Sequence, residues 1–118
     1  MNTKSIVLEK AIKFALRVVK LYRYLSEQKK EFVLSKQLLI SGTYIAKFAM
    51  AATQSPNRAS FGANMNNALQ RASESEFWLL ILLEGEFLGR IEHKSMNVDC
   101  VELVKMLSAI VKTTNKDV

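Results

Sequence analysis

Residues 5–27 read SIVLEKAIKFALRVVKLYRYLSE, and this stretch decides the fold class. Its apolar side chains recur every three or four positions, which is the period of one face of an α-helix. Lysine and arginine side chains occupy the remaining stripe, and both residue types favour helix. A helix with so wide an apolar face must pack against other elements, so the pattern predicts an all-α protein.

The same period returns in three further segments. Together with the first, the predicted helices span about residues 5–27, 32–53, 58–88 and 96–114. Pro56 breaks the pattern after residue 53, because proline disfavours helix at the residue before it. Gly89 is typical of a residue that ends a helix, and Ser95 of one that begins the next. Four helices with short connections predict an antiparallel up-down-up-down four-helix bundle, with residues 1–118 as a single domain.

Composition excludes several classes of protein. The chain has 118 residues, of which 49% are hydrophobic, too many for a disordered tail. A single cysteine, Cys100, allows no internal disulfide, so we expect a reducing, cytoplasmic location. The longest apolar run has seven residues, whereas a membrane-spanning helix needs about 20. We therefore expect no membrane partner.

The apolar run Phe77–Leu83 surrounds its helix on every side. A four-helix bundle covers one side of each helix, so part of this run needs a further cover. The run therefore predicts a homo-oligomer, with Trp78 buried. We expect the oligomer interface to contain Phe77, Trp78, Leu80 and Ile81.

The positive charge lies at one end of the sequence. The formal net charge is +6, and residues 1–30 alone carry eight basic and two acidic side chains. Such a face can attract nucleic acid or an acidic protein, or it can serve only to solvate the helix. The predicted nucleic-acid-binding residues, here called the basic stripe, are Lys10, Lys13, Arg17, Lys20, Arg23, Lys29 and Lys30.

The residue types needed for catalysis are scarce. The only histidine is His93, in a predicted connection, and Cys100 has the pattern of a small core residue. A zinc site needs about four Cys or His ligands, and di-iron bundles need Glu-x-x-His pairs that are missing here. We therefore expect no enzyme activity, no metal site and no cofactor.

Two motifs resemble a known family. The second segment contains Gln37-Leu38-Leu39-Ile40-Ser41-Gly42-Thr43, and the third contains Glu74-Ser75-Glu76-Phe77-Trp78-Leu79. In this order and spacing they resemble the bacterial four-helix-bundle proteins encoded in intervening sequences of 23S ribosomal RNA genes. The accessory variability determinant of diversity-generating retroelements belongs to the same group. The resemblance covers nearly the whole chain.

The resemblance implies more than the periodicity does. It implies a homopentamer shaped like a barrel and, for the retroelement members, binding of RNA or DNA through basic surfaces and a reverse transcriptase as partner. The matching positions carry no catalytic role, and they are Gln37, Ser41, Gly42, Thr43, Glu74 and Trp78. Ser41, Thr43 and Glu74 are candidates for a hydrogen-bonded set between the second and third helices. A surface position for Glu74 is the alternative.

The sequence departs from the family after Gly42. Where the family usually has an asparagine and a glutamate, this chain has Phe48 and Ala51. Two function hypotheses follow from the residues and the resemblance together. The first is a non-catalytic pentamer that binds nucleic acid, and the alternative is a protein-interaction scaffold without nucleic-acid affinity.

Overall fold

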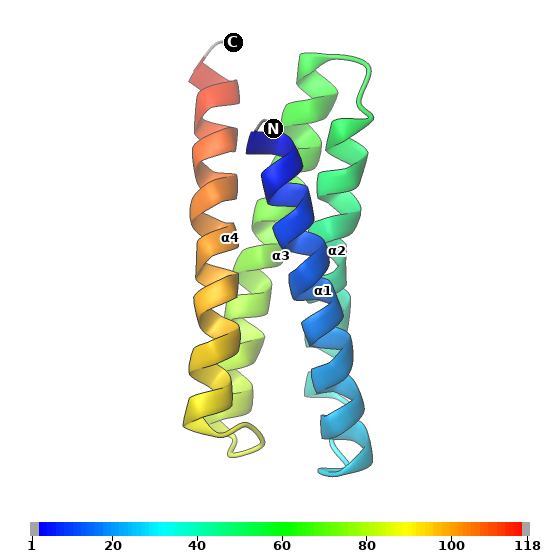
Figure 1. The fold of residues 1–118 in the computed structure, drawn as a ribbon, viewed down its shortest axis with the longest axis vertical. Coiled ribbons are helices and arrows are strands. Elements are labelled where there is room, and N and C mark those ends of the chain that lie inside the picture. Colours follow the sequence, from blue (N-terminus) through cyan, green and yellow to red (C-terminus); the bar gives the residue numbers. More distant parts are fainter. Residues whose placement is uncertain (1–2, 117–118) are drawn as a thin grey trace.

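Four α-helices form the computed structural model, which describes residues 3–116 (Figure 1). The helices are α1 (Thr3–Glu27), α2 (Leu34–Thr53), α3 (Arg58–Glu84) and α4 (Arg90–Lys116). Successive helices run in opposite directions, so the predicted up-down-up-down bundle is confirmed. No described helix is both long and apolar enough to cross a membrane.

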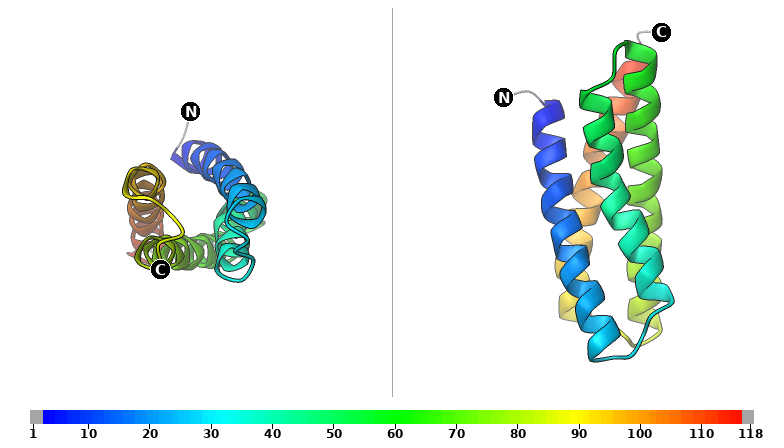
Figure 2. Two further views of the ribbon diagram at one scale, coloured as in Figure 1. Left: turned by 90° about the horizontal axis from the view of Figure 1, so that it is seen from below. Right: turned by 90° about the vertical axis from the view of Figure 1, so that its right-hand side faces the viewer.

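The helices pack in the order of the sequence around one apolar core. Contacts are extensive between α1 and α2, between α2 and α3 and between α3 and α4, and they are fewest between α1 and α4. Figure 2 shows the cause, since α1 leans towards α2 at its C-terminal end and away from the start of α4. The largest fully buried side chains come from all four helices and include Phe14, Leu38, Ile45, Met65, Leu79 and Leu103.

The predicted start of α2 at residue 32 is wrong by two residues, and a buried glutamate explains the difference. Lys30 has a φ of 55°, which turns the chain after α1. Glu31 then accepts hydrogen bonds from the backbone N–H groups of Val33, Leu34 and Ser35, at 3.0, 3.0 and 2.7 Å. Free N–H groups at a helix start need acceptors, and one carboxylate three residues before the helix supplies them.

The connection between α3 and α4 also differs from the prediction. Helix α3 ends at Glu84 rather than 88, and α4 begins at Arg90 rather than 96, so Gly89 precedes α4 and Ser95 lies inside it. Glu86 has a φ of 66°, and the N–H groups of Phe87 and Leu88 both bond the carbonyl of Leu82. This turn folds the buried Leu88 back onto the core, which ends α3 one turn early.

A glycine in the middle of α2 allows α1 to approach closely. A Cβ atom on Gly42 would lie 2.8 Å from Cγ2 and 3.0 Å from Cγ1 of Val18. Val18 is fully buried and its branched side chain has little freedom to move. Glycine therefore sets the separation of α1 and α2 at this point.

Gly42→Ala is expected to destabilise the protein despite the better helix propensity of alanine. The propensity gain is about 1 kcal/mol, whereas overpacking a core costs about 1–3 kcal/mol. We expect a net loss of roughly 1 kcal/mol in the free energy of unfolding by urea. In a Val18→Ala background the clash is gone, so Gly42→Ala should be neutral or stabilising. An equal loss in both backgrounds would contradict the close approach.

Glu31→Gln tests the carboxylate at the start of α2. Burial acts to raise the pKa of Glu31, but its hydrogen bonds from Ser35, Leu34 and Val33 outweigh this and lower the pKa from its usual 4.5. The stabilisation is therefore present above pH 4.5 and is lost as the pH falls through the lower value in the folded protein.

At pH 7 we expect Glu31→Gln to lower the free energy of unfolding by about 1–2 kcal/mol, because charge-assisted hydrogen bonds are the stronger ones. At pH 3 the gap between the two proteins should shrink, since protonated glutamate resembles glutamine. Glu27→Gln, at an exposed neighbour, is the control. A gap that stays constant from pH 7 to pH 3 would show that the charge contributes nothing.

Candidate nucleic-acid interface

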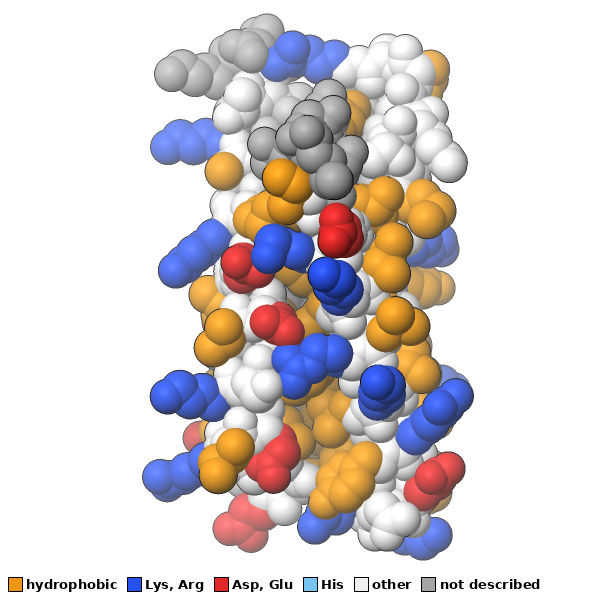
Figure 3. Space-filling view, in the orientation of Figure 1, with side chains coloured by type: hydrophobic (Ala, Val, Ile, Leu, Met, Phe, Trp, Pro, Cys, Tyr) orange, Lys and Arg blue, Asp and Glu red, His pale blue; other side chains and the backbone are white. Residues whose placement is uncertain are grey.

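Three of the seven residues of the basic stripe form ion pairs with neighbouring acids. Lys10 lies 3.1 Å from Glu102 on α4, and Lys13 lies 3.4 Å from Glu9 on its own helix. Arg17 donates to Asp99 at 2.6 Å. Figure 3 shows blue and red side chains meeting along the seam between α1 and α4. These three cations therefore hold α1 to α4 or to itself rather than presenting a free positive face.

Arg17 makes the most extensive of these contacts. Besides Asp99, its guanidinium donates to the carbonyl oxygen of Ser95 at 3.2 Å and to the hydroxyl of Ser95 at 2.7 Å. Both partners lie on α4, 78 and 82 residues away. Sequence patterning could not place them, because the turn of α4 that faces Arg17 depends on where the α3–α4 connection ends.

The remaining four cations gather at one end of the bundle. Lys20, Arg23, Lys29 and Lys30 are all exposed, on the last turns of α1 and the connection that follows. In the described part of the chain no carboxylate lies within ion-pairing distance of them. Tyr24, which is 46% exposed, lies among them. The structure thus shortens the predicted stripe to a compact group, here called the basic end.

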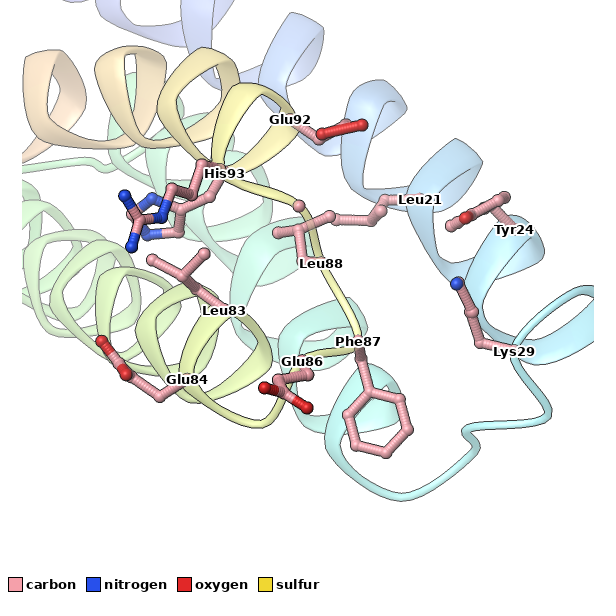
Figure 4. A pocket seen from close by; sticks show the side chains of 12 residues that line it. Leu21, Tyr24, Lys29, Leu83, Glu84, Glu86, Phe87, Leu88, Glu92 and His93 are labelled. Carbon is pink, nitrogen blue, oxygen red and sulfur yellow. The ribbon is translucent and has the colours of Figure 1, made fainter.

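A cleft of about 1110 Å³ opens beside the basic end, where α1 leans away from α4 (Figure 4). Leu21 and Tyr24 line it from α1 and Lys29 from the connection after α1, while Phe87 and Leu88 line it from the α3–α4 connection. Its rim carries both signs of charge, through Lys29, Arg90, Glu84, Glu86 and Glu92. The mixture of charges matches no single ionic ligand.

The four residues predicted for the oligomer interface differ in their exposure within one chain. Phe77 is 52% exposed and Leu80 is 46% exposed, so each leaves about half of its apolar surface uncovered. Trp78 and Ile81 are partly buried. Within one chain the Trp78 side chain packs against the core and lines a hollow between α2 and α3, so its burial in an oligomer stays a prediction. Phe77 and Leu80 also line a hollow of about 350 Å³ beside α4.

Four of the six residues at positions that match the family motifs line a single hollow. Gln37 and Ser41 from α2, and Glu74 and Trp78 from α3, line a hollow of about 440 Å³ between these helices, here called the α2/α3 hollow. Gly42 and Thr43 lie elsewhere, since Gly42 faces Val18 and the Thr43 hydroxyl donates to the carbonyl of Leu39 on its own helix at 2.7 Å.

The predicted hydrogen-bonded set forms with a different partner. Ser41 is buried, and its hydroxyl oxygen lies 2.9 Å from that of the buried Ser75. Glu74 is exposed instead and lies 3.3 Å from Arg71. Side chains at neighbouring positions of a helix point about 100° apart. Ser75 therefore faces inward, whereas Glu74 faces the solvent. A serine pair links α2 to α3 without burying a charge.

Aromatic and cationic side chains alternate beside the hollow. Lys47 Nζ lies 4.2 Å from the ring centre of Tyr44 and 5.8 Å from that of Phe48. The guanidinium carbon of Arg71 lies 5.1 Å from the Tyr44 ring. This cation–aromatic cluster was missed from the sequence, although the spacing of Tyr44, Lys47 and Phe48 by three and four places them on one helix face.

The residues with chemical reactivity form no centre. His93 lies in the first turn of α4 rather than in a connection. Cys100 is fully buried and lies 3.3 Å from the carbonyl of Ala72, as its pattern predicted. Among the described residues no three His, Cys, Asp or Glu side chains are grouped as metal ligands.

Comparison with known proteins identifies the family. The sequence profile of the 23S rRNA-intervening sequence protein family matches residues 3–109. The chain belongs to this family. A crystal structure of a protein of unknown function from the S23 ribosomal protein family of Bacteroides thetaiotaomicron is 40% identical. That comparison covers 94% of this chain and 99% of that chain, with a TM-score of 0.92. No curated protein matches the chain.

Cys100 should be inert in the folded protein. Burial raises the pKa of its thiol to about 12, with smaller contributions from the charges of Glu76 and Asp99. The thiolate is the reactive form, so disulfide reagents should not label the native protein at pH 8. One thiol per chain should react in 8 M urea. Rapid labelling of the native protein would contradict the buried position.

Proposed function

We propose that this 23S rRNA-intervening sequence protein is a non-catalytic, homopentameric bundle that binds RNA or DNA through its basic end. The observation that carries the proposal is the group formed by Lys20, Arg23, Lys29 and Lys30, which are exposed and have no described carboxylate within ion-pairing distance. Unpaired lysine and arginine side chains bind phosphate with little regard to base sequence.

Self-association would bring several basic ends together, so that weak phosphate contacts add up. The exposed faces of Phe77 and Leu80 and the hollow beside α4 supply an apolar surface for another copy. In a closed ring each copy adds one basic end, and contacts that are weak singly combine through effective concentration. Pentamer formation is the expectation that the family resemblance contributes.

A protein-interaction scaffold is the second candidate. The cleft of about 1110 Å³ favours it, because a lining that mixes apolar side chains with both signs of charge suits a polypeptide better than a polyphosphate. In this alternative the basic end steers an acidic protein partner towards the cleft.

Fluorescence anisotropy with a labelled RNA hairpin and a DNA duplex, from 50 to 300 mM salt, tests the first candidate. We expect binding that weakens steeply with salt. Lys20→Gln with Arg23→Gln should weaken binding by about tenfold at low salt and reduce the salt slope by about two.

The matched control is Lys10→Gln with Lys13→Gln, which removes the same charge from the same helix at positions already paired with Glu102 and Glu9. Its effect should be the smaller of the two. Absence of binding at 50 mM salt would overturn the nucleic-acid proposal and leave the scaffold. Equal effects of the two double variants would show that total charge, not the basic end, determines binding.

A further inference from the structure

The α2/α3 hollow has the size and lining of a site for a flat polar ligand. Its volume of about 440 Å³ lies within the range of roughly 300–1,000 Å³ that small-molecule sites occupy. Trp78 and Phe77 border it, with ring centres 5.0 Å apart and planes at 71°. Trp78 therefore offers aromatic surface to a flat ligand that enters the hollow, by stacking or by edge contact.

The polar groups of the hollow suit the edge of a nucleobase. The Gln37 side-chain amide both donates and accepts hydrogen bonds, and the Glu74 carboxylate accepts them. Proteins recognise unpaired bases by stacking them on aromatic rings and bonding their edges with such groups. Both side chains are exposed, so a ligand can reach them.

The cation–aromatic cluster beside the hollow offers a binding site for the phosphate of a nucleotide. Lys47 is exposed, and within the described residues no carboxylate lies within ion-pairing distance of its ammonium. The rings of Tyr44 and Phe48 hold this ammonium in place without using its N–H donors in conventional hydrogen bonds. Arg71 lies between the Tyr44 ring and Glu74, so it connects the cluster to the hollow.

We propose that the α2/α3 hollow and the cation–aromatic cluster together bind single-stranded nucleic acid, with one base beside Trp78 and a neighbouring phosphate on Lys47, next to the Arg71–Glu74 ion pair. Alternation of aromatic and cationic side chains along a groove is the pattern that binds single strands. A duplex keeps its bases stacked inside, so it can reach only the cations. The inference rests on the proposed function and adds the strandedness of the ligand and a second contact surface.

The single tryptophan makes the site directly observable, because Trp78 is the only one in the chain. The probe is a 12-nucleotide RNA strand of mixed sequence that cannot pair with itself, compared with the duplex it forms with its complement. Binding of the single strand should quench Trp78 fluorescence, with a midpoint equal to the Kd from anisotropy. The duplex should bind at low salt and leave the Trp78 fluorescence unchanged.

Charge variants locate the site independently. Lys47→Gln with Arg71→Gln should weaken single-strand binding by about tenfold and abolish the quenching, with little effect on the duplex. Lys105→Gln with Lys112→Gln, at exposed positions on α4 across the bundle from α2, removes equal charge and should change binding by less than about twofold. Urea unfolding of each variant checks that the fold is kept.

The outcomes separate this inference from the proposed function. Single-strand binding without any Trp78 response, and with full affinity in the Lys47/Arg71 variant, would overturn the α2/α3 site while leaving binding at the basic end. Equal quenching by strand and duplex would overturn the single-strand preference. Absence of binding by either nucleic acid would overturn the proposed function, and the inference with it.

Discussion

The close packing of α1 on α2 at Gly42 is the constraint on which the rest of the bundle depends. Since no Cβ atom separates Gly42 from Val18, α1 lies close against α2 at this point, and α1 makes far fewer contacts with α4 than with α2. Two features follow from the packing of α1 against α2 rather than against α4. Ion pairs such as Arg17–Asp99 bridge the middle of the α1–α4 seam, and a cleft opens where the two helices part.

Electrostatics divides α1 into two parts with different tasks. From Lys10 to Arg17 its cations pair with nearby carboxylates, in ion pairs that are partly exposed and contribute modestly to stability. Its last turns carry cations that meet no described carboxylate. Because unpaired cations are the ones that can release counterions from a phosphate backbone, the net charge of +6 says less about binding than its pairing does.

The surface between α2 and α3 combines structural and ligand-directed roles. The buried Ser41–Ser75 pair fixes how the two helices sit against each other, and the exposed Gln37 and Glu74 border a hollow directly above it. The ring of Phe48 packs edge-on against Tyr44. It thus extends an aromatic surface beside Lys47.

The sequence alone determined the four helices, their antiparallel order and most of the core, because apolar spacing at the helical period is a local property. It also placed Cys100 in the core. Only the tertiary structure decided the ends of α3 and α4, since these depend on a turn that returns Leu88 to the core. It alone decided which cations are free, because Asp99 and Glu102 reach α1 from about 80–90 residues away. Pairing across helices depends on rotation and register, which no spacing within one helix encodes.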